Sequence, residues 1–144
     1  MQKKFMNEAL KEARKAYKKD EVPIGAIIVK DNGIISKAHN LVETKKDATM
    51  HAEIIAIKKA SKKIGNWRLN DCEMYVTLEP CLMCQKAIEL SRIKKVYFST
   101  YRKNDDNKLT LYEKYDYYET YTTKIIQDFF NNKRRWCYNI ISCY

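Results

Sequence analysis

The sequence predicts an α/β protein with three layers, in which a mixed, mostly five-stranded sheet lies between helices on both faces. Two observations predict it. Short apolar segments early in the chain flank a tight-turn signal, which indicates an antiparallel hairpin. Later strand-like segments alternate with longer segments of helical periodicity, and such connections allow parallel pairing.

The first elements are a helix and the hairpin. Apolar residues recur at helical spacing over residues 3–18, with lysines and glutamates on the other face. Residues 23–29 form an apolar segment that reads as a strand. Residues 31–33 (Asp-Asn-Gly) suit a hairpin turn because Asn and Gly tolerate positive φ, and 34–39 is the returning strand.

A second helix is predicted over residues 49–63. Thr49 or Asp47 can cap its start, and Gly65 can end it.

The remaining elements follow the same alternation. A strand is predicted at residues 73–78, and Pro80 suits the first turn of a helix that runs to about Ser91. Residues 93–100 form the next strand. A helix around 115–132 is expected near the C-terminus, with a strand before it as the alternative.

Length and charge limit the function classes. We expect residues 1–144 to form a single domain. The net charge of +10 fits either a solvated surface or a polyanionic partner, since lysines that neutralise phosphates release counterions. Charge alone does not separate these two interpretations.

The cysteines and the N-terminal region indicate the compartment. Five cysteines cannot all pair within the chain, and no signal peptide or membrane-spanning apolar segment is recognisable. We therefore expect a cytoplasmic protein that does not enter a membrane. Cys72, Cys137 and Cys143 are interpreted as ordinary thiols, with a Cys137–Cys143 pair as the alternative.

One pair of motifs carries the chemistry. His51 and Glu53 begin the second predicted helix, and Cys81 and Cys84 lie one turn apart after Pro80. One imidazole and two thiolates are zinc ligands, and three protein ligands leave a fourth position open, as in catalytic sites. A Cys-x-x-Cys segment alone also fits a redox dithiol or a structural zinc. With the His-x-Glu motif, catalytic zinc is favoured.

Glu53 is expected to act as the proton shuttle rather than as a ligand. Zinc lowers the pKa of a bound water, and a nearby carboxylate can move its proton to a ring nitrogen and then to a leaving amine. This chemistry is hydrolytic deamination of a base, at C4 of cytosine or C6 of adenine. His39 lacks this motif context and is interpreted as a packed or surface histidine.

The chain resembles the zinc-dependent cytidine deaminase superfamily and, within it, the bacterial-type tRNA-specific adenosine deaminases. The resemblance rests on Glu-Val-Pro-Ile-Gly-Ala at 21–26, His-Ala-Glu-Ile at 51–54 and Tyr-Val-Thr-Leu-Glu-Pro-Cys at 75–81. The signature itself is known for zinc deaminases. Gln85 and Lys86 stand where this family usually has small residues.

The resemblance implies conversion of adenosine to inosine at the wobble position of a tRNA anticodon. It implies one Zn²⁺ per subunit, bound by His51, Cys81 and Cys84, and a homodimer that binds the anticodon stem-loop. It also implies that Asn40 and the Ala52 N–H contact the target nucleotide and that Ile24 lines the pocket. RNA contacts are expected from five basic residues, which are Arg102, Lys103, Lys133, Arg134 and Arg135.

Two other functions share features with this hypothesis. A free-base or nucleoside deaminase acting on guanine or cytosine would use the same zinc chemistry but needs no basic surface. A non-catalytic, deaminase-like RNA-binding subunit would be expected to lack the proton shuttle, and Glu53 is present.

Overall fold

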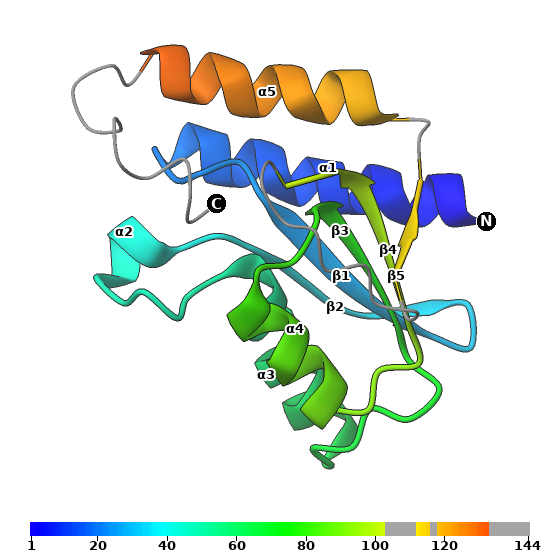
Figure 1. Ribbon diagram of the computed structural model, residues 1–144. Coiled ribbons are helices and arrows are strands. Elements are labelled where there is room, and N and C mark those ends of the chain that lie inside the picture. The colour runs from blue at the N-terminus through cyan, green and yellow to red at the C-terminus, as the bar shows by residue number, and fades with distance from the viewer. Residues whose placement is uncertain (103–111, 116–117, 133–144) are drawn as a thin grey trace.

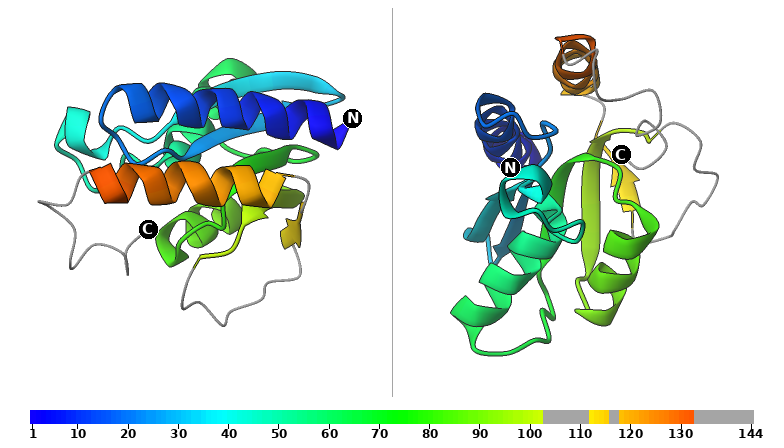
Figure 2. Two further views of the ribbon diagram at one scale, coloured as in Figure 1. Left: turned by 90° about the horizontal axis from the view of Figure 1, so that it is seen from above. Right: turned by 90° about the vertical axis from the view of Figure 1, so that its left-hand side faces the viewer.

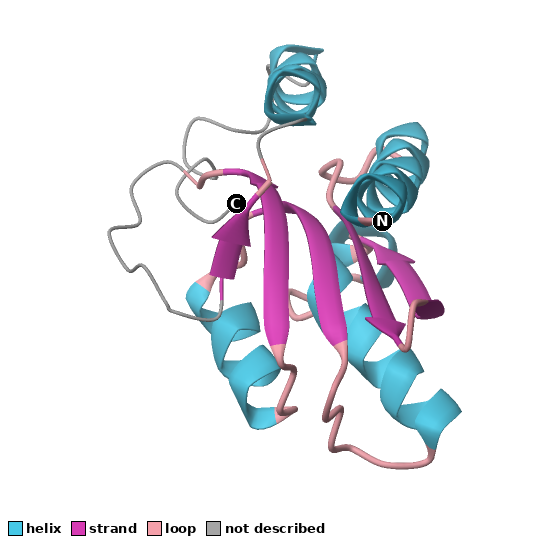
Figure 3. Cartoon of the chain, turned by 90° about the vertical axis from the view of Figure 1, so that its right-hand side faces the viewer, coloured by secondary structure: helices cyan, strands magenta, loops and turns pink. Residues whose placement is uncertain are grey.

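The computed structural model of the chain describes residues 1–102, 112–115 and 118–132. A five-stranded sheet with the order β2-β1-β3-β4-β5 forms its middle layer. Helices α1 and α5 lie on one face, and α3 and α4 lie on the other (Figures 1 and 3). The predicted three-layer fold with a mixed sheet is therefore confirmed.

The helices are α1 (Gln2–Lys18), α2 (Val42–Lys45), α3 (Ala52–Ile64), α4 (Leu82–Leu90) and α5 (Glu119–Asn132). The strands are β1 (Gly25–Lys30), β2 (Gly33–His39), β3 (Glu73–Leu78), β4 (Lys95–Thr100) and β5 (Tyr112–Lys114). In these described parts of the chain, no helix combines the length and the apolar character that a membrane crossing requires.

Strand directions follow from the connections. The β1–β2 hairpin is antiparallel, and β1 also pairs antiparallel with β3. The β3–β4 pair is parallel because α4 carries the chain back between them, and β4–β5 is parallel as well. The carboxyl ends of β3 and β4 therefore lie at the same edge of the sheet.

The alternation of side chains along each strand separates two apolar clusters. Ile27 and Tyr75 face α1, where Phe5 packs on Tyr75 with ring centroids 5.3 Å apart. Ile28 and Val76 point to the opposite face and pack with α3 and α4. Both faces of the sheet are thus covered, as its continuous apolar strands require.

Gly25 lets α1 lie close to β1. A Cβ at this position would stand 2.0 Å from the carbonyl oxygen of Ala9 and 2.5 Å from the backbone nitrogen of Ala13. The absence of a side chain is therefore a packing requirement, and it fixes where the chain enters the sheet.

Helix α5 lies beside α1, as Figures 1 and 2 show. Tyr17 of α1 packs edge-on against Phe129 with centroids 6.0 Å apart, and Arg14 donates a 2.8 Å hydrogen bond from Nε to the hydroxyl of Tyr121. The predicted C-terminal helix is confirmed, although it begins at Glu119, and the strand considered as its alternative, β5, precedes it.

The predicted starts of two further helices were also wrong, and one short helix was missed. Helix α3 begins at Ala52 rather than at residue 49, since Asp47 closes a separate turn by accepting hydrogen bonds from Thr49. Helix α4 begins at Leu82, so Pro80 precedes it instead of lying in its first turn. The four-residue helix α2 was not predicted at all.

Candidate metal centre

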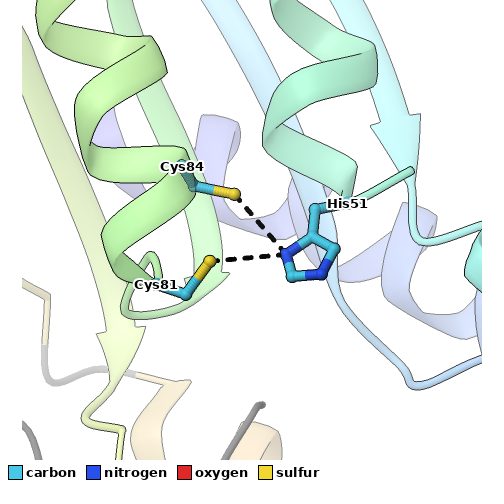
Figure 4. Close-up of side chains that lie close together, drawn as sticks. All are labelled: His51, Cys81 and Cys84. Carbon is cyan, nitrogen blue, oxygen red and sulfur yellow. Dashed lines mark hydrogen bonds between the residues drawn. The ribbon is translucent and has the colours of Figure 1, made fainter. Parts of the chain in front are cut away.

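Three side chains from two helix starts converge at the carboxyl edge of β3. The Nδ1 atom of His51 lies 3.6 Å from Sγ of Cys81 and 3.5 Å from Sγ of Cys84. All three side chains point toward one another (Figure 4). Within the described residues they form the one His/Cys/Asp/Glu group close enough to share a metal ion.

These distances fit tetrahedral zinc. For sulfur about 2.3 Å and nitrogen about 2.0 Å from one ion, the tetrahedral angle separates the two atoms by about 3.5 Å. The measured separations of 3.6 Å and 3.5 Å agree with this value. Three ligands from the chain leave one coordination position for a water or a substrate.

Local structure explains why two of these residues face each other. His51 and Cys81 are the N-cap residues of α3 and α4, both with extended backbone conformation and neither with a side-chain cap hydrogen bond. Their side chains are therefore not engaged in capping, and they point toward each other across the two helix starts (Figure 4). The helix N-termini carry partial positive charge, which favours thiolate at this point.

The two thiols differ in proton affinity because they lie next to each other. A hydrogen bond from Cys84, followed by one from His51, lowers the pKa of Cys81 to about 3. The same hydrogen bond to Cys81, together with burial, raises the pKa of Cys84. One thiolate and one thiol thus share a proton, which a divalent metal would replace.

Glu53 lies in the first turn of α3, two residues after the histidine. Its side chain is 3% exposed, and Oε2 has no hydrogen-bond partner among the described residues. Burial raises the pKa of this carboxyl group. An unpartnered buried oxygen beside the cysteine–histidine cluster is available for a proton or for a polar ligand.

The expected substrate contacts are also buried. Asn40 is 1% exposed, and its Oδ1 lacks a hydrogen-bond partner in the described part of the chain. Ala52 is the first residue of α3, where helical N–H groups have no intrahelical acceptor. Ile24 is buried, and its carbonyl oxygen accepts a 3.1 Å hydrogen bond from the backbone N–H of Asn40.

Arg102 is only 9% exposed, unlike a typical surface cation. Its backbone N–H donates to Oε2 of Glu79 at 3.1 Å, and its Nε has no hydrogen-bond partner in the described residues. The charge of Arg102 acts on the proton equilibria of both His51 and Glu53. Lys103, Lys133, Arg134 and Arg135 lie outside the described residues.

Two buried polar residues, Glu21 and Gln85, were not predicted as functional. Glu21 accepts hydrogen bonds from Asn40 and from the first residues of α2. Gln85 is 4% exposed and donates from Nε2 to the carbonyl oxygen of Pro80 at 2.9 Å. The sequence signal that could have identified Glu21 is its position as a charged residue directly before the apolar segment that begins with Val22.

His39 lies apart from the metal ligands, as expected. Its Nδ1 is 2.9 Å from Oε2 of Glu12, and its Nε2 is 3.0 Å from Nζ of Lys19. It therefore connects β2 to α1 as a packed, hydrogen-bonded histidine.

Comparison with known proteins gives a family match over the segment that contains this centre. The family described as the cytidine and deoxycytidylate deaminase zinc-binding region matches residues 1–100. A tRNA-specific adenosine deaminase from Aquifex aeolicus is 44% identical over 142 residues, which cover 90% of this chain and 94% of the relative.

Two solved structures show the fold and differ in their described activity. One, from a study of A-to-I editing by tRNA:A34 deaminases at the wobble position, is 44% identical with a TM-score of 0.67, covering 69% of this chain and 75% of the other. The other, guanine deaminase from Bacillus subtilis, is 39% identical with a TM-score of 0.66, covering 69% and 64%. Because the family match spans the entire centre and the Aquifex relative aligns over nearly its whole length, the chain belongs to the zinc-binding cytidine and deoxycytidylate deaminase family.

Proposed function

We propose that this chain is a zinc-dependent hydrolase that converts adenosine to inosine at the wobble position of a tRNA anticodon. The observation that carries the proposal is the zinc-compatible spacing of His51, Cys81 and Cys84 beside the buried carboxyl group of Glu53, whose Oε2 has no hydrogen-bond partner among the described residues. The similarity to the Aquifex tRNA-specific adenosine deaminase supports the choice of substrate. One Zn²⁺ per subunit follows from the single three-ligand group in the described residues.

The reaction replaces an amine with a carbonyl oxygen. When bound, zinc supplies the nucleophile by lowering the pKa of a water towards about 7. Glu53 accepts the proton of that water and delivers it to N1 of adenine as the new C6–O bond forms. Glu53 then returns the second water proton to the exocyclic nitrogen, the C6–N bond breaks, and ammonia leaves.

The pocket residues hold the target base in this scheme. Asn40 hydrogen-bonds the nucleotide, the Ala52 N–H contacts the base, and Ile24 forms an apolar wall. All three lie buried close to the start of β1 or α3. Their burial supports a base that is taken out of its stack and enclosed.

RNA contacts outside the pocket are proposed for the basic residues. A cavity of about 260 Å³ lies between the ends of β3 and β4 and helix α5, with Arg102, Tyr101 and Phe130 in its wall. Arginine and aromatic side chains are suited to phosphates and unstacked bases. We place Arg102 at this contact, together with four residues outside the described structure, which are Lys103, Lys133, Arg134 and Arg135.

We also propose that residues 1–144 are a single domain that forms a homodimer in the cytoplasm. Leu82, Met83 and Leu90 expose apolar side chains on α4, the helix that follows Cys81. A second subunit covering them would lie next to the metal centre. Thiol ligands and a tRNA substrate both fit a reducing, intracellular compartment.

A guanine deaminase is the second candidate, favoured by the structural similarity to the Bacillus subtilis enzyme. It would keep the same ligands and the same proton shuttle. The net charge of +10 is more readily explained by an RNA substrate than by a free base.

The deciding experiment incubates the zinc-loaded protein with an anticodon stem-loop that carries adenosine at the wobble position. Parallel reactions contain free guanine, cytosine and cytidine, and products are measured by mass spectrometry. Inosine in the stem-loop alone is the expected result. Xanthine from guanine without inosine would replace the proposal with the second candidate.

A further inference from the structure

Glu21 is a fully buried carboxylate that the proposed chemistry does not use. It lies between α1 and β1 and is 0% exposed. Its Oε1 accepts a 2.6 Å hydrogen bond from the backbone N–H of Thr44, and its Oε2 accepts a 3.2 Å bond from that of Glu43. Among the described residues no Lys or Arg forms an ion pair with it. Hydrogen bonds from N–H groups therefore stabilise this buried charge.

The third donor to Glu21 is the side chain of Asn40. Nδ2 of Asn40 lies 3.3 Å from Oε2 of Glu21. An ionised carboxylate only accepts hydrogen bonds, so the NH₂ group of the amide must face it. The carbonyl oxygen Oδ1 then points elsewhere.

Oδ1 of Asn40 is buried and has no hydrogen-bond partner in the described part of the chain. The backbone of this residue is held too, through its N–H bond to the Ile24 carbonyl oxygen. Neither the main chain nor the amide is free to turn this oxygen toward water. A buried acceptor without a donor is costly, and a ligand that brings a donor removes the cost.

We propose that Glu21 is a positioning residue that fixes the Asn40 amide, so that Oδ1 accepts a hydrogen bond from an N–H or O–H group of the substrate nucleotide. This inference rests on the proposed function, because it takes Asn40 as a substrate contact. The carboxylate acts through Asn40 and does not touch the substrate. The site would then discriminate against ligands that place only a hydrogen-bond acceptor opposite Oδ1 of Asn40, because that buried oxygen would stay without a donor.

The substitution Glu21→Gln tests the orientation of the amide. The glutamine oxygen can keep the short bond to Thr44, which places its NH₂ group toward Asn40 and toward the backbone N–H of Glu43, whose bond to this side chain is then lost. The Asn40 amide must then turn over, so that Oδ1 faces Gln and the NH₂ group faces the substrate. We expect kcat/KM to fall about 10- to 100-fold, because the substrate loses one buried hydrogen bond when Oδ1 of Asn40 no longer faces it.

A second change should rescue the first. In the Glu21→Gln background, Asn40→Asp accepts a hydrogen bond from the new NH₂ group with one oxygen and keeps the other as an acceptor for the substrate. The double variant should recover to within about 10-fold of wild type. Asn40→Asp alone brings two carboxylates together and should be worse than the double variant.

The rescue separates positioning from a structural role. All variants are normalised to zinc content and folded fraction, and Glu113→Gln, a surface change on β5, serves as the charge-matched control. If Glu21→Gln lost activity only in proportion to folded protein, or if the double variant were no better than Asn40→Asp alone, the acceptor role would be wrong.

The assay also separates this inference from the proposed function. Each variant is measured with whichever substrate the wild type deaminates, the stem-loop or guanine. The wild-type result alone decides the substrate. The pattern among the variants alone decides the role of Glu21.

Discussion

At the scale of single residues, the proposed proton transfer would use Glu53, a buried carboxyl group whose Oε2 has no hydrogen-bond partner among the described residues. Glu53→Gln keeps the size of the side chain but cannot accept the proton of water. We predict a fall in kcat of about 10²- to 10⁴-fold, the usual contribution of general acid–base catalysis. Zinc content, measured by atomic absorption, should remain that of the wild type. Near-normal turnover would remove Glu53 from the mechanism.

Two of the cysteines, Cys72 and Cys84, are equally buried but lie in different surroundings. Cys84 lies 3.5 Å from Nδ1 of His51, whereas Cys72 is buried in the apolar core. We predict that Cys84→Ser loses bound zinc and activity, because the hydroxyl is a poorer zinc ligand than thiolate. Cys72→Ser should keep stoichiometric zinc and serves as the matched control. Full zinc occupancy in Cys84→Ser would exclude it as a ligand.

At the scale of elements, the contact between α1 and β2 includes a buried acid. A hydrogen bond from His39, and a further one from Lys15, lower the pKa of Glu12 to about 2. A lowered acid pKa contributes stability that is fully present above about pH 4.5 and disappears as the pH falls towards 2. We therefore predict that Glu12→Gln is less stable than wild type at pH 6 by about 1–2 kcal/mol.

The pH dependence distinguishes this effect from a packing defect. Urea unfolding at several pH values should show the wild type and Glu12→Gln converging as the pH falls from 5 to 2. A constant difference over that range would show that the charge of Glu12 is not responsible.

The start of α4 depends on a side chain that the family resemblance did not anticipate. The buried side chain of Gln85 donates a hydrogen bond to the carbonyl oxygen of Pro80. We predict that Gln85→Ala lowers the free energy of unfolding by about 1–2 kcal/mol, since it leaves that carbonyl without its donor. Lys86→Ala, an exposed neighbour, should change stability by less than about 0.5 kcal/mol. Equal effects in the two variants would contradict this assignment.

At the scale of the whole molecule, a bound metal would connect helices that belong to different parts of the chain. His51 precedes α3, and Cys81 precedes α4. We predict that a zinc chelator lowers the melting temperature by about 10 °C or more, because metal binding and folding are coupled. Calorimetry at fixed protein concentration measures this, and the Cys84→Ser variant should not respond to the chelator. An unchanged wild-type melting temperature would contradict the coupling.

The periodicity and the motifs of the sequence were enough to predict much of the fold and the chemistry of the candidate site. The alternation of strands and helices predicted the mixed sheet, and the Asp31-Asn32-Gly33 turn predicted the hairpin. The zinc ligand types and their spacing predicted a deaminase, since few chemistries use one imidazole and two thiolates with a carboxylate nearby. These signals lie in the order and spacing of residues along the chain, so they can be recognised without knowing which elements are in contact.

Only the tertiary structure decided which distant residues meet. Helix α2 has weak propensity as a four-residue segment and begins where Glu21 accepts its N–H groups. The approach of α1 to Gly25 and the orientation of the Asn40 amide likewise depend on contacts across elements. The sequence alone determined the chemistry available to this protein, because each motif carries its own ligand set. The packing of α1, α2 and the sheet decided how the side chains of the site are oriented, because that orientation comes from hydrogen bonds between residues far apart in the chain.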